Sequence, residues 1–365
     1  MRFLEIDQLE DMAAGAAILG SGGGGATHDE LAMARCALEQ WGPVRLLSID
    51  ELDPELPLFP MAFMGAPTVA SEKIPSGREF ELLYEAVSRE MGREPQAAVA
   101  LEIGGGNAFA PLPGAARRGI PLLDADSIGR AFPELQMSSC HLAGVVPSPT
   151  FLVDACDNLA LLRTGDTVQM ERFCRALTVE MGSSAALSIY PMRGAQAREA
   201  LVGGTVSLAI ALGSCVRQAR HKGENPAQAL VAFAGGRHFG SGMITSIDQR
   251  IEKGFLRGSL TVQGDREEES FSVDYQNEYL LLSRAGQPLA ATPDLLVLLE
   301  EETGEAITSD SLQYGMRVAL LALPAHGLWR TPRGLSLVGP QAFGYAIDYA
   351  SVACIEEQPS FIAQR

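Results

Sequence analysis

Residues 97–107 read AAVALEIGGGN: an apolar run, interrupted by Glu102, leads directly into three glycines and Asn107. A short continuous apolar run is typical of a strand that is buried on both faces of a sheet. A helical stretch follows as far as Arg118, and the next apolar run, Ile120–Leu123, predicts a second strand. Because strands alternate with helices over residues 1–150, the sequence favours a parallel α/β layer.

The pattern extends outward in both directions. Toward the N-terminus, the sequence predicts a helix over 5–19, a glycine-rich connection and a second helix from Thr27. Beyond Gly235, short apolar runs separated by turn residues fill 243–330, which indicates a β-barrel or sandwich. We therefore expect an α/β domain over 1–235, a β-rich domain over 236–332 and a closing segment, 333–365, that packs on the first domain.

Composition narrows the class of protein. The chain has 365 residues, enough for about two domains. Its net charge of −17 repels phosphate backbones, so a nucleic-acid partner is not expected. No Cys-x-x-Cys pair indicates a structural zinc site. The start of the chain has no signal-peptide pattern, and the apolar stretch 201–216 is shorter than the ~20 residues that span a bilayer. We expect a cytoplasmic protein with reduced thiols and no membrane partner.

Two glycine-rich stretches are candidate ligand loops. Ser21-Gly22-Gly23-Gly24-Gly25 lies between two predicted helices, and Gly104-Gly105-Gly106-Asn107 follows a predicted strand. Such residues let a backbone approach a ligand closely and expose amide donors, which suits an anionic or carbonyl-bearing ligand. The alternatives are a flexible connection for the first stretch and a tight strand-to-helix turn for the second.

Carboxylates follow the same predicted strands. Glu102 interrupts one strand, and Asp124 and Asp126 end the next. Since carboxyl ends of parallel strands share one edge of a sheet, we expect the three to form one cluster for acid/base work or cation binding. The alternatives are a buried ion pair for Glu102 and an N-cap of a short helix for Asp126. Arg130 either binds a ligand carboxylate or neutralises the aspartates.

The other polar candidates are weaker. Ser71–Gly77 is a polar loop whose Glu72-Lys73 pair is either part of the site or a surface salt bridge. Five histidines are isolated in sequence, and only His28 and His141 lie near candidate motifs. No second ligand is close in sequence to either histidine, so the sequence does not define a metal site.

Taken in order, these segments resemble the S-methyl thiohydantoin desulfurase family, whose members are often encoded near hydantoinase and oxoprolinase subunits. The resemblance covers nearly the whole chain. It is carried by 19–24, 65–69, 71–77, 102–107, 124–137, Asn277-Glu278-Tyr279-Leu280, Pro293-Asp294-Leu295, Tyr314-Gly315 and Val338-Gly339-Pro340. It implies an α/β N-terminal domain with a C-terminal β-barrel-like domain. The segments Ala26–Asp29 and Cys140-His141 depart from the family pattern and predict a different substrate pocket.

The resemblance implies a hydrolase that releases a thiol from a small five-membered cyclic amidine. Glu102 or Asp124 would activate water, Asp126 would donate a proton, and Asn107 with the glycine amides would bind the ring carbonyl. Arg130 or Lys73 would hold a carboxylate tail. A divalent metal is an alternative water activator, and the cofactor stays open. The expected substrate-binding residues are Ser21, Gly22, Gly23, Gly24, Gly104, Gly105, Gly106, Glu72, Lys73, Arg130 and Glu134.

Two other classes of function remain open at this point. A protein encoded beside a hydantoinase would serve as its non-catalytic subunit or partner, with the glycine loops at an interface. A small-molecule-binding regulatory module is the third class. The carboxylates at adjacent strand ends favour the enzyme, and a homo-oligomer is compatible with each of the three.

Overall fold

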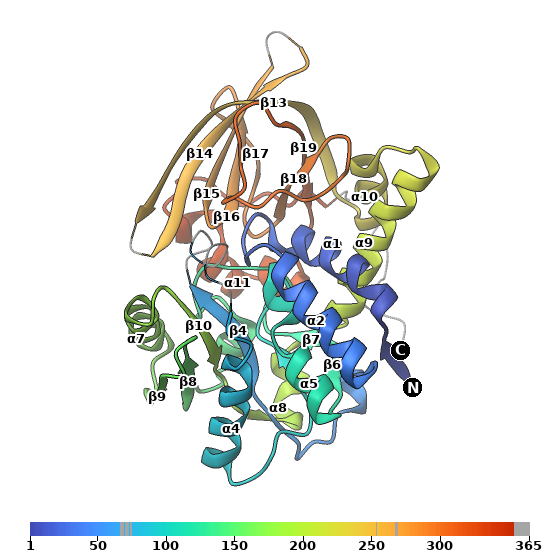
Figure 1. The fold of residues 1–365 in the computed structure, drawn as a ribbon. Helices are drawn as coiled ribbons and strands as arrows, with labels where there is room; N and C mark the ends of the chain where they lie inside the picture. Colours follow the sequence, from blue (N-terminus) through green and yellow to red (C-terminus); the bar gives the residue numbers. More distant parts are fainter. Residues whose placement is uncertain (66–68, 70–72, 74, 253, 267–268, 354–365) are drawn as a thin grey trace.

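The computed structural model describes residues 1–65, 69, 73, 75–252, 254–266 and 269–353. Two regions are seen in Figure 1: a mixed α/β region and, above it, a curled antiparallel sheet. The expected fold class, an α/β N-terminal region followed by a barrel-like β region, is thereby confirmed.

The main sheet of the α/β region is mixed rather than parallel. Its five strands lie in the order β5 (Val99–Ala100), β4 (Pro60–Gly65), β10 (Ser184–Ser188), β8 (Thr150–Val153) and β9 (Leu159–Leu162). Of these pairs, β4 and β5 are parallel and the others are antiparallel. The strand β10 therefore comes from the second half of the sequence and lies between two strands of the first half.

Three smaller sheets complete this region. The three-stranded sheet joins β1 (Arg2–Leu4), β2 (Val44–Leu47) and β6 (Leu122–Leu123), with β2 and β6 parallel. Two-stranded ladders join β3 (Pro57–Leu58) to β11 (Met192–Arg193) and β7 (Ala125–Asp126) to β12 (Val202–Gly203). Among the strands of the described residues, β2–β6 and β4–β5 keep the parallel arrangement that the alternating sequence pattern predicted, and an isolated parallel bridge joins Ala98 to Leu122.

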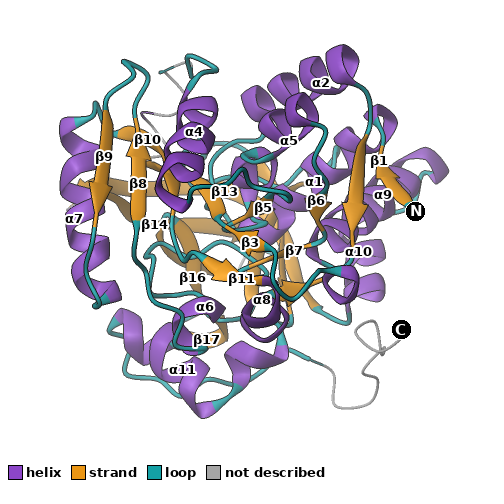
Figure 2. Cartoon of the chain, turned by 90° about the horizontal axis from the view of Figure 1, so that it is seen from below, coloured by secondary structure: helices purple, strands orange, loops and turns teal. Residues whose placement is uncertain are grey.

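Helices cover these sheets on both sides (Figure 2). The contact between two of these helices depends on small residues: a Cβ on Gly15 would overlap the backbone of Ala209, and one on Gly213 would overlap that of Asp11. These glycines let the helix of residues 9–20 lie directly against the helix of residues 205–222. The helices are α1 (Leu9–Gly20), α2 (His28–Trp41), α4 (Glu79–Met91), α5 (Leu112–Arg118), α6 (Ser139–Leu142), α7 (Thr167–Glu180), α8 (Gly194–Ala200), α9 (Thr205–Lys222) and α10 (Pro226–Ala234).

The C-terminal sheet has seven antiparallel strands and curls into a half-barrel around its own apolar core (Figure 1). Alternating burial along β15, with Phe271, Val273 and Tyr275 buried, shows one face turned to that core. The strands are β13 (Arg237–Glu252), β14 (Phe255–Gly264), β15 (Ser270–Gln276), β16 (Glu278–Arg284), β17 (Gln287–Ala291), β18 (Leu295–Glu300) and β19 (Arg317–Leu323), in the order β17-β16-β15-β14-β13-β19-β18.

After β19 the chain returns to the α/β region through α11 (Pro332–Val338). Trp329 is fully buried and donates its Nε1–H to the carbonyl of Ile128 at 2.7 Å. Its ring meets that of Phe132 edge to face, with centroids 5.3 Å apart. This contact supports the irregular segment 127–138, which carries several of the candidate site residues.

Candidate active site

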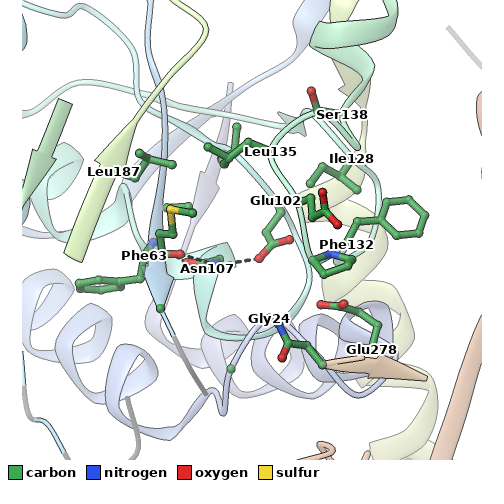
Figure 3. Close-up of a pocket in the computed structure, with 18 of the residues that line it drawn as sticks. Gly24, Phe63, Glu102, Asn107, Ile128, Phe132, Leu135, Ser138, Leu187 and Glu278 are labelled. Carbon is green, nitrogen blue, oxygen red and sulfur yellow. Dashed lines mark hydrogen bonds between the residues drawn. The ribbon is translucent and has the colours of Figure 1, made fainter. Parts of the chain in front are cut away.

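A small cavity lies where the α/β region meets the β15–β16 hairpin (Figure 3). Its volume is about 110 Å³. For scale, an engineered protein cavity of about 150 Å³ holds one benzene ring. The cavity is thus suited to a ligand of about one small ring. Its walls combine apolar side chains, among them Phe63, Ile128, Phe132, Leu135 and Leu187, with the carboxylates of Glu30, Glu102, Glu134 and Glu278.

Glu102 reaches the cavity because the chain leaves the sheet after β5. Asn107 lies in the 3-10 helix Gly105–Phe109, and its side chain bonds the backbone of β4 beyond the point where β5 ends. Its Oδ1 accepts the backbone N–H of Phe63 at 2.6 Å, and its Nδ2 donates to the Phe63 carbonyl at 3.2 Å. The same Nδ2 donates to Oε1 of Glu102 at 2.6 Å. Asn107 therefore positions the Glu102 carboxylate while it holds the edge of the sheet.

Glu278 brings a second carboxylate to the cavity from the other half of the chain (Figure 3). It is the first residue of β16, directly after Asn277, whose φ of 57° turns the hairpin. Glu278 is 2% exposed, and its Oε2 has no hydrogen-bond partner. A Cβ on Gly23 would overlap this carboxylate, so the glycine gives Glu278 its space.

Sequence reasoning did not select Glu278 as a site residue. Two signals were present: the run Asn277-Glu278-Tyr279-Leu280, which carries part of the family resemblance, and an acidic residue at the start of an apolar strand pattern. A buried glutamate is uncommon unless it is paired, and that rule could have singled it out.

Arg130 lies behind the cavity and is 1% exposed. Its Nη1 donates to the carbonyls of Pro293 and Asp294 at 2.5 and 3.0 Å, and its Nε donates to that of Ala131 at 3.0 Å. Its Nη2 is buried without a hydrogen-bond partner. Arg130 does not line the cavity, so a direct contact with a ligand carboxylate finds no support here. Its charge instead acts on Glu102 and Glu278 through space.

The two central glutamates have strongly perturbed acidities. Burial raises the pKa of Glu102 to about 8, and the hydrogen bond from Asn107 opposes that shift. Burial also raises the pKa of Glu278 to about 8; the charge of Glu102 adds to this shift and that of Arg130 opposes it. Both shifts have the same direction, so burial favours the protonated form of each glutamate over the charged form.

This shift has a consequence for stability. Folding raises the pKa of both glutamates above their usual 4.5, so the folded chain gains stability from binding protons. That stability is complete below pH 4.5 and is lost as the pH rises toward about 8. We expect the double variant Glu102→Gln, Glu278→Gln to show a smaller fall in melting temperature over this window than the wild type. Parallel melting curves for the two proteins across that pH range would contradict the raised acidities.

Asp126 is fully buried but does not line the cavity. Its Oδ2 accepts the backbone N–H groups of Ile103, Ile128 and Gly129 at 2.9, 3.0 and 2.8 Å. The predicted N-cap is wrong, because no helix follows in residues 127–132. The carboxylate closes a turn and ties that turn to the residue after Glu102, and its charge helps to raise the pKa of Glu102.

Asp124 lies apart from the other two carboxylates. It accepts the backbone N–H of Ser207 at 2.9 Å and the Ser207 hydroxyl, and it pairs with Arg2 at 3.4 Å. Ser207 is in the first turn of α9, where free N–H groups and the helix dipole favour a carboxylate. The prediction of one cluster of Glu102, Asp124 and Asp126 is therefore wrong: the second carboxylate at the cavity is Glu278.

The capping contact makes a direct prediction. Replacing Asp124 with Ala should lower the free energy of unfolding by about 1–2 kcal/mol, the usual cost of losing a helix cap. The turnover of the folded fraction should stay at the wild-type value, since Asp124 does not line the cavity. Thermal melting and a rate corrected for folded protein measure the two effects. A large loss of rate without a loss of stability would return Asp124 to the catalytic residues.

The two glycine stretches meet, but mainly to pack against each other. Gly106 donates its N–H to the carbonyl of Gly25 at 3.2 Å, and a Cβ on Gly105 would overlap the backbone of Gly24. Gly24 and Gly25 line the cavity, whereas Gly104, Gly105 and Gly106 do not. The close approach of two backbones thus explains much of the glycine content that we assigned to ligand binding.

The start of the first glycine stretch holds the C-terminal sheet in place. Ser21 donates its hydroxyl to the carbonyl of Leu296 at 2.8 Å and accepts the backbone N–H of Tyr279 at 2.7 Å. Gly22 accepts the N–H of Ser309 at 2.8 Å, and a Cβ there would lie 2.6 Å from the ring of Tyr279. Ser21, Gly22 and Gly23 therefore form the contact that sets Glu278 beside Glu102.

The structure places the other candidate residues, Glu134, Lys73 and Glu72, differently. Glu134 lines the cavity, and its carboxylate accepts a hydrogen bond from the side chain of Gln136. Lys73 donates to the carbonyls of Met181, Gly182 and Ser184 at 3.0, 3.4 and 3.3 Å, which ties it to the start of β10. Glu72 lies outside the described residues.

The described part of the chain has no group of three or more His, Cys, Asp or Glu side chains arranged to hold a metal ion. Among these same residues, no helix combines the length and apolar character needed to cross a membrane.

Comparison with known proteins identifies the family. The model described as "S-Me-THD-like, N-terminal domain" matches residues 7–164, and the corresponding C-terminal model matches 165–352. The chain belongs to the S-Me-THD-like family. No match was found among proteins of curated function.

The S-Me-THD-like chain is also similar to a protein of known structure. A crystal structure of a protein from Chromobacterium violaceum shares 26% sequence identity with it and superimposes with a TM-score of 0.80. The match covers 96% of this chain and 100% of the other. Within this shared architecture, the N-terminal family domain supplies Glu102 and Asn107, and the C-terminal family domain supplies Glu278.

Proposed function

We propose that the protein is a hydrolase that removes the sulfur substituent from a small five-membered cyclic amidine such as an S-methyl thiohydantoin. The observation that carries this proposal is the pair of buried glutamates, Glu102 and Glu278, in a cavity of one-ring size. Membership of the S-Me-THD-like family supports the choice of substrate.

The reaction needs two proton transfers, and the pair is suited to both. One glutamate, as carboxylate, takes a proton from water while the water oxygen attacks the ring carbon between sulfur and nitrogen. The other, as carboxylic acid, donates a proton to the ring nitrogen of a neutral ring; a ring that arrives as the amidinium already carries this proton. When the C–S bond breaks, the proton held by the first glutamate passes to the leaving sulfur, and the hydroxyl proton of the tetrahedral intermediate passes to the carboxylate of the second glutamate. The ring thereby gains a carbonyl and a thiol departs, while the first glutamate ends as a carboxylate and the second as a carboxylic acid.

The surrounding residues prepare the pair for these roles. A general acid and a general base work best when their pKa values lie near the operating pH. Burial places both groups there, Asn107 fixes the orientation of Glu102, and Arg130 limits the repulsion when both lose their protons. The apolar wall of Phe63, Phe132 and Leu187 would exclude bulk water from a bound ring.

Thiol release from S-methyl thiohydantoin tests the proposal. The purified protein should release methanethiol, detected with a thiol reagent, far faster than buffer or the Glu278→Gln variant. The assay is run after chelator treatment and again with added zinc or manganese, so that metal dependence is measured. Release no faster than in buffer under every condition would overturn the proposal. Co-purification with a hydantoinase-like protein in that case would support the partner-subunit function.

A further inference from the structure

We propose that the cavity takes its ligand as a cation, namely the protonated amidinium form of the ring. This inference rests on the proposed function and specifies the charge state of its substrate class.

The charges of the lining residues favour a positive occupant. Four segments each supply one carboxylate: Glu30 at the start of α2, Glu102 after β5, Glu134 in the 127–138 segment and Glu278 at the start of β16. Among the described lining residues, Arg175 is the single cationic side chain.

The guanidinium of Arg175 already has partners within the protein. Its Nε donates to Oε1 of Glu171 at 2.8 Å and its Nη2 to the carbonyl of Pro133 at 3.0 Å. Its guanidinium carbon lies 4.6 Å from the ring centre of Phe255. Since Glu171 offsets its charge, Arg175 leaves the cavity acidic overall, and an anionic ring would be repelled.

An unused acceptor also points to a hydrogen-bond donor. Oε2 of Glu278 is buried without a partner, and its residue lines the cavity. An amidinium presents N–H donors in one plane and carries a positive charge opposite to that of a carboxylate. Hydrogen bonds between such groups are charge-assisted and strong. A neutral ring oxygen offers only lone pairs to the same atom.

Proton linkage follows from this arrangement. The charges that act on Glu278 are Glu102, Arg130 and Arg175, and Asp126 acts in turn on Glu102; Glu30 and Glu134 are the other acids of the cavity. Burial favours the protonated form of the central pair, whereas a bound cation favours its charged form. Cation binding should therefore release a proton and become tighter as the pH rises toward about 8.

Calorimetry with two simple rings tests the inference. The cationic probe is 2-(methylthio)-2-imidazoline, a five-membered S-methyl amidine that is protonated at neutral pH. The neutral probe is 2-imidazolidinone, a cyclic urea of similar shape. We expect the cation to bind about tenfold to a hundredfold more tightly, the scale of one charge-assisted hydrogen bond. Titrations in buffers of different ionisation enthalpy should show proton release for the cation alone.

Matched variants separate the local effect from the net charge. Glu278→Gln should remove the preference for the cation. Glu39→Gln, on the exposed side of α2, changes the net charge equally and should keep it. Equal affinity for both rings, or a preference that survives Glu278→Gln, would overturn the inference. Cation binding without thiol release from any S-methyl ring would support cation selection and count against hydrolysis. Thiol release without a preference for the cation would support hydrolysis and count against cation selection.

Discussion

Replacing Glu278 with Gln should lower kcat for thiol release by about 10²–10⁴, the contribution of one general acid or base. The amide keeps the size of the side chain but can neither accept a proton from water nor donate one at neutral pH. Initial rates with S-methyl thiohydantoin, divided by the concentration of folded protein, measure the effect. The Glu102→Gln variant should show a loss of the same scale, since the two groups act as a pair.

The control for this experiment is a glutamate that is buried elsewhere. Glu79 is 3% exposed and accepts the backbone N–H of Ser76 at 2.7 Å, outside the cavity. Glu79→Gln should leave the rate per folded molecule unchanged. Glu278→Gln should melt at or above the wild-type temperature, because it removes a buried acidic group whose Oε2 has no hydrogen-bond partner. A Glu278→Gln protein that is folded and fully active would exclude this glutamate from the reaction.

Replacing Gly105 with Ala should lower the free energy of unfolding by about 2–5 kcal/mol, the sum of left-handed backbone strain and overpacking. The residue has a φ of 65°, and its Cβ would overlap the backbone of Gly24, which has no side chain to move aside. Sequence reasoning placed Gly105 at a ligand surface, where a side chain would block binding and spare the fold. The structure indicates a larger effect on folding. Urea unfolding measures the difference.

Gly119 provides the matched comparison. It has the same φ of 65°, but nothing lies within 4 Å of the position that a Cβ would take. Gly119→Ala should therefore cost only about 1–2 kcal/mol, from the left-handed conformation alone. Equal losses for the two variants would show that the contact between the glycine stretches does not contribute to stability.

Some of the site could be predicted because it depends on local sequence. Glu102 and Asn107 lie within one short segment, and an acidic residue that interrupts a buried strand has to meet either a partner or a cavity. Both glycine stretches could be singled out from composition alone, and the structure brings them into contact. The predicted position of the Asp124 carboxylate was wrong. Asp124 lies two residues before Asp126, yet its carboxylate binds the N-terminus of α9 rather than joining Glu102.

The remainder depends on contacts between distant parts of the chain. Glu278 lies beside Glu102 because Ser21 and Gly22 bind the backbone of the C-terminal region. The periodicity of apolar residues does not predict contacts between such distant segments. The prediction of a parallel sheet was wrong for a related reason. Alternation of strands and helices does not specify strand order, and the Asn107 side chain, rather than a further strand residue, bonds the backbone of Phe63.

The position of β10 has a consequence for synthesis on the ribosome. When the first half of the chain has emerged, β4 and β8 both present open edges, because the strand that separates them has yet to be translated. Unpaired edges of this kind invite association between nascent chains. These two edges are covered only when residues 184–188 have been translated and β10 inserts between them. The proposed pair of glutamates would be complete later still, when translation has passed Glu278.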